Sequence, residues 1–236
     1  MDFLYNVPAI FHKKTLIVGD THFGIEQKIK KKGIHYSNFS STIAERLEEL
    51  IKETKAKKLV ILGDVKDYIL SMDETTERIL NRFADIIDLT IVKGNHDGGI
   101  ESLKWKTVDH LIIDNLGLVH GHSWPDKKVM GADYLVSAHQ HPQIEMIDKL
   151  GKKHVEPAWF VLEPEKKNIK KHYNEFNDKI KLVLMPAFNP LVGSPIKKDQ
   201  KSHLGPILNN NLFKLNDAIV YRLDGSCLGK LKNLRK

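Results

Sequence analysis

The sequence predicts an α/β fold, with a parallel sheet in the first half of the chain and a strand-rich second half. Three short apolar runs, 15–19, 58–63 and 89–94, each end in glycine and have the pattern of strands that are buried on both faces. A helical segment lies between each successive pair of these runs. The order strand–helix–strand–helix–strand predicts parallel pairing with right-handed crossovers.

The two segments between these strands have apolar residues at helical spacing. The first covers residues 38–55 and begins with several hydroxyl side chains that are suitable as caps. The second covers residues 73–87, where Asp73 is placed to cap the first turn. The apolar stripes are Ile43, Leu47, Leu50 and Ile51 in the first segment, and Ile79, Leu80, Phe83 and Ile87 in the second.

The second half of the chain predicts a second, largely antiparallel sheet with few helices. Two polar segments, 163–179 and 189–211, interrupt it and read as loops, and loops longer than about 12–15 residues are uncommon unless they are functional or disordered. No linker or internal repeat divides the chain, so we expect a single domain over residues 1–236. The predicted strands are 108–114, 117–119, 134–138, 144–147, 158–162, 180–185 and 218–223.

Composition restricts the class of protein. The chain is 41% hydrophobic and 28% charged, a globular balance. No apolar run reaches the roughly 18 residues of a membrane span, and the first residues lack the pattern of a secretory signal. We therefore expect a cytoplasmic protein that does not associate with membranes. The single cysteine, Cys227, excludes an internal disulfide and a thiolate zinc cluster, so any metal site must use His, Asp, Glu or Asn.

The net charge has two interpretations. The chain carries 37 basic and 30 acidic residues, a formal charge of +7, which favours an anionic partner. However, only five of the basic residues are arginine, and a composition rich in Lys and poor in Gln is also typical of heat-adapted proteins. The basic excess is therefore explained equally by an anionic ligand and by a thermophilic source.

Five of the predicted strands end on residues that can bind a metal ion. In an α/β sheet, ligands bind outside the carboxyl ends of the strands, where these side chains would gather. Ordinary turn chemistry explains any one of these placements alone, because Asp and Asn are common turn residues. Five coincident placements indicate a metal site. The residues are Asp20 and His22, then Asp64, then Asn95, His96 and Asp97, then His120 and His122, and finally His139 and His141.

The types of side chain indicate which metals fit. Imidazoles, carboxylates and one amide, without thiolates, suit Mn, Fe, Ni, Co or Zn. Seven candidate ligands exceed what one ion takes from a protein, so we expect two ions that share a carboxylate. Such pairs of ions lie about 3.5–4 Å apart and promote in-line displacement at phosphorus.

The order of the motifs resembles that of the calcineurin-like metallophosphoesterases. The patterns D-x-H, G-D-x-x-D, G-N-H-D, H and [G/A]-H-x-H occur in that order within residues 19–141, with Ala138 where the last pattern usually has glycine. The stretches HGHSWP (120–125) and MPAFNPLVG (185–193) are similar to an archaeal subgroup whose bacterial relatives include a DNA-ligase-associated endonuclease. The resemblance implies a four-layer sandwich of two mixed β-sheets flanked by helices, with the metal site at the C-terminal ends of the strands.

The resemblance also implies roles for individual residues. Asp64 would bridge two divalent ions, with manganese as the first choice and nickel, iron, cobalt or zinc as alternatives. A hydroxide between the ions would attack phosphorus, and His96 would protonate the leaving group. The Asp67 carboxylate would orient His96 through one ring nitrogen. The implied ligands are Asp20, His22, Asp64 and His141 for the first ion, and Asp64, Asn95, His120 and His139 for the second.

We therefore expect a metal-dependent phosphoesterase that acts on phosphate esters, with a phosphodiester favoured over a monoester. A nuclease acting on DNA or RNA is the alternative, motivated by the lysines of 28–32 and by the Lys-rich segment 163–179. An inactive scaffold is less favoured, because every implied metal position is filled. Two residues stay open: His122 contacts the site or lies in a turn, and Glu26 supports the site or lies in a solvated loop.

Overall fold

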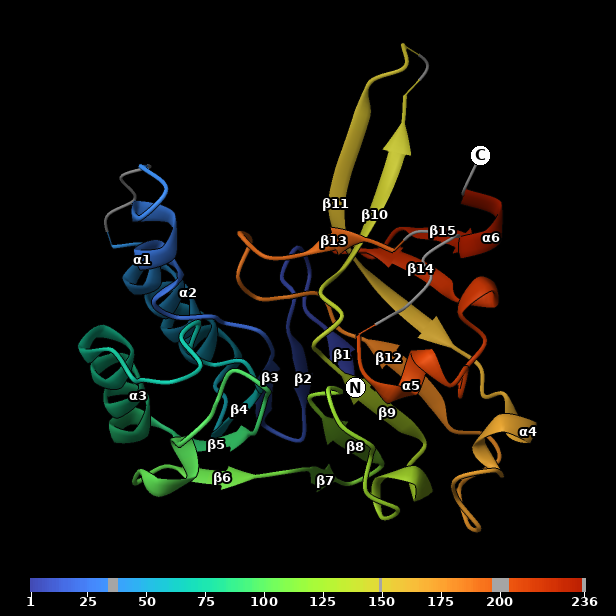
Figure 1. Ribbon diagram of the computed structural model, residues 1–236, viewed down its shortest axis with the longest axis horizontal. Coiled ribbons are helices and arrows are strands. Elements are labelled where there is room, and N and C mark those ends of the chain that lie inside the picture. The colour runs from blue at the N-terminus through green and yellow to red at the C-terminus, as the bar shows by residue number, and fades with distance from the viewer. Residues whose placement is uncertain (34–37, 149, 197–203, 235–236) are drawn as a thin grey trace.

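Two mixed β-sheets pack face to face in the computed structural model, which describes residues 1–33, 38–148, 150–196 and 204–234 (Figure 1). The strands of the first sheet are β1 (Asp2–Phe3), β2 (Ile10–His12), β3 (Thr15–Val18), β4 (Lys58–Leu62), β5 (Asp88–Val92) and β6 (Lys106–Val108). Their spatial order follows their order in the chain. Strands β3 to β6 pair in parallel, whereas β1 and β2 add antiparallel strands that the sequence did not predict.

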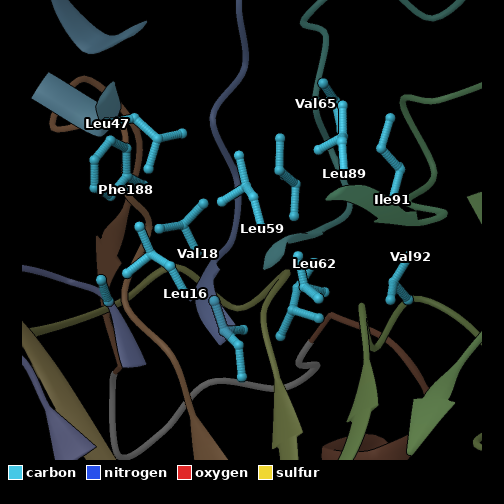
Figure 2. Packing of buried hydrophobic residues seen from close by; sticks show 14 of the residues in the cluster. Leu16, Val18, Leu47, Leu59, Leu62, Val65, Leu89, Ile91, Val92 and Phe188 are labelled. Carbon is cyan, nitrogen blue, oxygen red and sulfur yellow. The ribbon is translucent and has the colours of Figure 1, made fainter. Parts of the chain in front are cut away.

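The helices predicted between the first strands are present. The helices of this half are α1 (Ile25–Lys30), α2 (Phe39–Thr54) and α3 (Glu74–Ile86), and η1 (Ile100–Ser102) is a single 3-10 turn. The Asp73 side chain caps α3 by accepting a hydrogen bond from the backbone N–H of Thr76 at 3.0 Å. Both apolar stripes are buried in the same core as the first sheet, and Figure 2 shows Leu47 of α2 beside Phe188 from the loop after β12 (Lys181–Leu184).

The second sheet is more mixed than the sequence predicted. Its strands are β7 (Leu111–Ile113), β8 (Leu116–Val119), β9 (Tyr134–Ser137), β10 (Pro142–Ile147), β11 (Lys153–Leu162), β12, β13 (Ser194–Pro195), β14 (Ile219–Arg222) and β15 (Cys227–Lys230). The order is β13-β10-β11-β12-β9-β8-β7, and β14 joins β11 and β15. Strand β9 pairs in parallel with both β8 and β12, so a largely antiparallel sheet was the wrong expectation for its centre. Apolar runs reveal strands but not their partners.

The predicted strand 108–114 is also corrected. Its residues divide between β6, which ends the first sheet, and β7, which ends the second. The chain crosses from one sheet to the other at Asp109 and His110, which lie in neither strand. A continuous β-rich sequence therefore conceals the point where the chain changes layer.

Side chains alternate between two cores along the central strands of the second sheet. On β12, Val183 packs in the core that contains the first sheet, whereas Leu182 and Leu184 pack in a second core on the outer face. Short helices cover this outer face, namely α4 (Lys166–Ile169), α5 (Pro206–Asn209) and α6 (Leu231–Leu234), with 3-10 turns η2 (Val129–Gly131) and η3 (Leu215–Asp217). The expected α/β fold with two mixed sheets and flanking helices is thus confirmed.

The two segments predicted as loops are only partly irregular. Segment 163–179 contains α4, and segment 189–211 contains β13 and α5, while its residues 197–203 lie outside the described part of the chain. Strands β10 and β11 form a long hairpin that projects from the body of the molecule (Figure 1). Among the described residues, no helix has both the length and the apolar character that crossing a membrane requires.

Candidate metal centre

The residues that follow the parallel strands meet at one place between the two sheets. Asp20 and His22 follow β3, Asp64 follows β4, and Asn95 and His96 follow β5. From the second sheet, His120 follows β8, and His139 and His141 follow β9. The backbone ties these segments together, because the N–H of His22 donates to the Asp64 carbonyl at 2.9 Å and the N–H of His139 donates to the Asp20 carboxylate at 3.1 Å.

Three groups of side chains at this place can each hold a metal ion. In the first group, Asp20, His22, Asp64 and His141 each offer a ligand atom, and these atoms all lie within 4.8 Å of one another. In the second, Asp64, His120 and His139 satisfy the same condition. The Asn95 amide oxygen lies 3.2 Å from Nε2 of His120, which adds it to the second group. Asp64 belongs to both of these groups, which match the two sets that the resemblance implied. The third group, His22, Asp67 and His96, matches neither set.

The buried nitrogens of the first group have no hydrogen-bond partner. Within the described part of the chain, the Nε2 atoms of His22 and His141 are buried without one, whereas Nδ1 of His22 faces the Asp67 carboxylate. Nε2 of His22 lies 3.7 Å from Asp64, and Nε2 of His141 lies 3.2 Å from Asp20. Unpartnered buried polar atoms are costly and need an explanation. A divalent cation that these nitrogens and carboxylates share would supply it, and the donor types suit such an ion.

The backbone at these positions is strained. Five of the seven predicted ligands are non-glycine residues with positive φ, a conformation that costs of order 1–3 kcal/mol when tertiary structure imposes it. Strain of this kind concentrates at functional sites because the surrounding structure must hold it in place. The residues are Asp20 (φ 55°), His22 (42°), Asp64 (48°), His139 (66°) and His141 (43°).

Two glycines allow the strand ends to approach one another. A Cβ atom at Gly63, where φ is 71°, would collide with the His120 ring, and one at Gly94 would collide with the backbone nitrogen of Asp64. The glycines that end the predicted strands therefore leave room for a ligand side chain and for a neighbouring strand end.

The pKa values describe a site that favours positive charge. Burial alone would lower the pKa of His120, but its contact with Asp64 and the charge of Asp20 raise it to about 9. In turn, the contact with His120 holds the pKa of Asp64 below its usual range, although burial acts in the opposite direction. Burial, together with the nearby His120 charge, lowers the pKa of His139 to about 4. The carboxylates thus stabilise a cation at the centre of the cluster.

The structure corrects the expected link between Asp67 and His96. The Nδ1 atom of His96 lies 2.7 Å from the main-chain carbonyl oxygen of Asp67, not from its carboxylate. The carboxylate lies 3.5 Å from Nδ1 of His22 and 4.0 Å from Nζ of Lys28. These contacts lower the pKa of the Asp67 carboxyl, although burial acts in the opposite direction. The motif pattern places Asp67 near both rings, but only the fold decides which group of Asp67 faces which ring.

The comparison with known families identifies the family of the chain. The family model for the calcineurin-like phosphoesterases matches residues 13–157, which include all the predicted ligands. The chain belongs to the calcineurin-like phosphoesterase family. This membership places the chain among metal-dependent hydrolases and confirms the family that the motif order predicted.

A solved nuclease structure shares the fold of this calcineurin-like phosphoesterase. The nuclease MPE of Pseudomonas putida is 20% identical, with a TM-score of 0.59 over 94% of this chain and 91% of that one. The phosphoesterase YfcE of E. coli is 17% identical, with a TM-score of 0.42 over 92% of this chain and 97% of that one. No curated protein sequence matches the chain.

Two residues that the sequence left open now have positions in the phosphoesterase. Glu26 neither faces the metal centre nor lies free in solvent, because its carboxylate accepts a hydrogen bond from the Ser40 hydroxyl at 2.6 Å and so joins α1 to α2. The His122 ring lies 5.3 Å from that of His120, and its Nδ1 atom is buried without a partner. Burial lowers the pKa of His122, so this ring favours the neutral form.

Three residues support the site through hydrogen bonds that the sequence did not predict. Asp97 is fully buried, and its carboxylate accepts hydrogen bonds from the backbone N–H groups of Val65 (2.9 Å) and Gly94 (2.8 Å). It thus joins the ends of β4 and β5, whereas the sequence placed it only among the metal-competent residues at the strand ends. Lys66 is buried and donates to the carbonyls of residues 68 and 69, next to Asp67. Asn189 donates to the Thr21 carbonyl at 2.9 Å, which ties the stretch 185–193 to the segment between Asp20 and His22.

A basic cleft opens beside the first metal-binding group. Its cavity measures about 400 Å³, and Lys28 and Lys32 line it together with His22, His96 and His141. Part of the lysine run at 28–32 therefore faces the centre. A second cavity of about 310 Å³ lies beside the other group, lined by His120, His122 and Trp124 among others. Of the remaining histidines, His35 and His203 lie outside the described part of the chain.

Proposed function

We propose that this protein hydrolyses phosphodiesters with two divalent cations. The observation that carries the proposal is that Asp64 belongs to both groups of candidate ligands, while His96 lies beside them in the basic cleft. Two bound cations would supply a nucleophile at neutral pH and neutralise charge on the phosphoryl oxygens. Manganese is the first choice, and nickel, iron, cobalt and zinc suit the same ligands.

His96 is placed to protonate the leaving oxygen. A carbonyl oxygen can only accept a hydrogen bond, so Nδ1 of His96 must donate to the Asp67 carbonyl 2.7 Å away. In the neutral ring, Nε2 then has no proton to give. His96 therefore acts as a general acid from its cationic form, with Nε2–H directed to the leaving oxygen. The backbone contact holds the ring in this orientation in either protonation state.

The cleft favours a diester over a monoester. Lys28 and Lys32 line the cleft beside the centre, and in a polynucleotide diester their charges would attract the neighbouring phosphates. Both sheets supply ligands, so we also propose that residues 1–236 act as a single domain. An inactive scaffold is disfavoured because every candidate ligand position is occupied by a metal-competent residue and lies in the cluster.

The test compares a diester with a monoester that has the same leaving group. Ethyl para-nitrophenyl phosphate and para-nitrophenyl phosphate are offered to protein stripped with a chelator and then loaded with Mn²⁺, Zn²⁺ or no metal. We expect hydrolysis only with metal and a higher kcat/KM for the diester. A preference for the monoester would contradict the diester assignment, and no hydrolysis with any metal would support a scaffold.

A nuclease is the second candidate, favoured by the two lysines in the cleft. The name of the Pseudomonas putida neighbour is consistent with it, at the level of a shared fold. Binding of a single-stranded oligonucleotide is measured at several salt concentrations. A nuclease should bind with an affinity that falls steeply with salt, since each neutralised phosphate releases counterions. Replacing Lys28 and Lys32 with Ala should flatten this dependence, whereas Lys166 and Lys167 in α4 provide a matched double replacement away from the cleft.

A further inference from the structure

A further cavity, with mainly apolar walls, shares His141 with the basic cleft. It measures about 260 Å³ and is bounded by the first turns of α2, the start of β10 and the loop after β12. Its walls include Phe39, Phe188, Pro142 and Pro190. We name this cavity the His141 pocket. No step of the proposed hydrolysis uses it.

The His141 pocket is continuous with the candidate metal centre. His141 and Val192 line both the pocket and the basic cleft. Nε2 of His141 lies 3.2 Å from the Asp20 carboxylate, so the ring that forms one wall of the pocket is also a candidate ligand of the first ion. A substrate with its phosphate at the metal centre would therefore have a neighbouring substituent within reach of the pocket.

The pocket combines apolar walls with polar groups at a few positions. Arg46, Asn6 and Gln143 also line it, and the Arg46 guanidinium donates to the Asn6 carbonyl at 3.4 Å. Sites of this composition bind ligands with apolar faces and a few polar edge atoms. A volume of about 260 Å³ is below the roughly 300–1,000 Å³ of pockets for drug-sized ligands, so it suits one ring system. An alkyl chain would make no hydrogen bond with these polar groups.

We propose that the His141 pocket binds the nucleobase next to the scissile phosphate. This inference rests on the proposed phosphodiesterase function and specifies its substrate as a nucleotide diester. The lysines of the cleft attract the phosphate backbone, and the pocket takes the aromatic base that the same backbone carries. Aromatic and proline surfaces receive any base by its face, which predicts little preference among the four bases.

The test removes one base at a time and keeps the phosphate and the leaving alkoxide unchanged. Thymidylyl-thymidine is compared with two analogues in which either the upstream or the downstream residue is an abasic tetrahydrofuran. We expect one of the two analogues to bind about tenfold more weakly and the other to bind like the parent, because only one of them lacks the base that stacks in the pocket. Equilibrium dialysis with chelator-treated protein gives the affinities without turnover, and KM with Mn²⁺ gives a second measure.

Variants test whether this difference in affinity arises in the His141 pocket. Thr42 lines the pocket from the exposed side of α2, so Thr42→Phe should fill its mouth and abolish the difference between the parent and the sensitive analogue. Glu53→Phe places the same ring on an exposed position near the other end of α2. It should keep the wild-type ratio of the two affinities, that for the parent dinucleotide and that for the sensitive analogue. Arg46→Ala is a second pocket variant that adds no bulk, and it should reduce the ratio. Thermal unfolding and metal content are recorded for each variant.

The outcomes separate this inference from the proposed function. Equal affinity for all three dinucleotides, with ethyl para-nitrophenyl phosphate still hydrolysed, would overturn the assignment of the pocket to a nucleobase. The proposed phosphodiesterase activity would stand. Loss of hydrolysis on every ester, with the base effect retained in dialysis, would overturn the activity and leave the pocket. If a hexyl ester of thymidine phosphate binds as well as the dinucleotide, an alkyl group fills the pocket and the nucleobase assignment is wrong.

Discussion

The Nδ1 atom of His96 lies 2.7 Å from the backbone carbonyl of Asp67, while the Asp67 carboxylate lies 3.5 Å from the His22 ring. One residue thus supports two imidazoles through two different groups. Substitution of Asp67 removes only the carboxylate and leaves its carbonyl in place. The fold therefore separates the support of a candidate ligand from the support of the candidate general acid.

Asp67→Asn should weaken metal binding more than it disturbs proton transfer. The carboxylate that faces the outer nitrogen of His22 is lost, and removal of such a partner typically costs about 10–100-fold in metal affinity or activity. Calorimetric titration with Mn²⁺ should show one weakened site, and saturating metal should restore most of the turnover. If the affinity stays at the wild-type level while turnover falls, the carboxylate acts on His96 after all.

Asp64→Asn should affect both ions. Asp64 is shared by the two groups of candidate ligands, so the loss of its charge should lower the metal stoichiometry and not only one affinity. The loss should exceed the roughly 10–100-fold that removal of an outer partner costs. Metal analysis after gel filtration, beside Asp67→Asn as the matched variant, measures this. Two tightly bound ions in Asp64→Asn would show that Asp64 does not bridge.

His96→Ala should slow esters according to their leaving group. General acid catalysis contributes about 10²–10⁴-fold where the leaving oxygen needs a proton, and nitrophenolate leaves without one. Cleavage of an alkyl diester should fall by roughly that factor, while cleavage of the nitrophenyl diester should fall much less. Metal content should match the wild type. An equal loss on both esters, together with loss of metal, would make His96 a ligand.

Asp97→Ala should destabilise the fold. Its buried carboxylate accepts three backbone N–H groups, from Val65, Lys66 and Gly94, and each buried donor left without a partner costs about 1–3 kcal/mol. We expect a loss of about 3 kcal/mol or more in the free energy of unfolding by urea. Asp85→Ala, at an exposed position of α3, should change it by less than about 0.5 kcal/mol. A small effect at Asp97 would mean that water replaces the carboxylate.

The metal-free protein should lose stability as the pH rises from about 6.5 to about 9. The folded state raises the pKa of His120 from 6.5 to about 9, so its contribution is complete below the unfolded pKa and disappears as pH passes the folded one. The pKa of His141 is also raised and contributes with the same sign. Urea unfolding at several pH values measures the slope, which should be smaller in His120→Gln. A slope that is unchanged in this variant would assign the dependence to other groups.

Local sequence determined helices α2 and α3, the first three parallel strands and the position of each candidate ligand. Periodicity of apolar residues reports which face of a segment is buried, and glycine followed by Asp or Asn marks where a strand ends. Because parallel strands of one sheet end at the same edge, the sequence alone places Asp20, Asp64 and Asn95 together. The spacing and order of the motifs then identified the family that the comparison confirmed.

Tertiary structure alone decided how the strands of the second sheet pair and that residues 108–114 divide between two sheets. It decided, too, that the main-chain carbonyl of Asp67 faces His96. It also decided that Asn189 reaches Thr21 and that Phe39 and Phe188 line one pocket. These relationships join residues far apart in the chain, and each depends on how whole layers pack. A local pattern specifies whether a side chain is buried, but the partner it meets depends on the packing of every element between them.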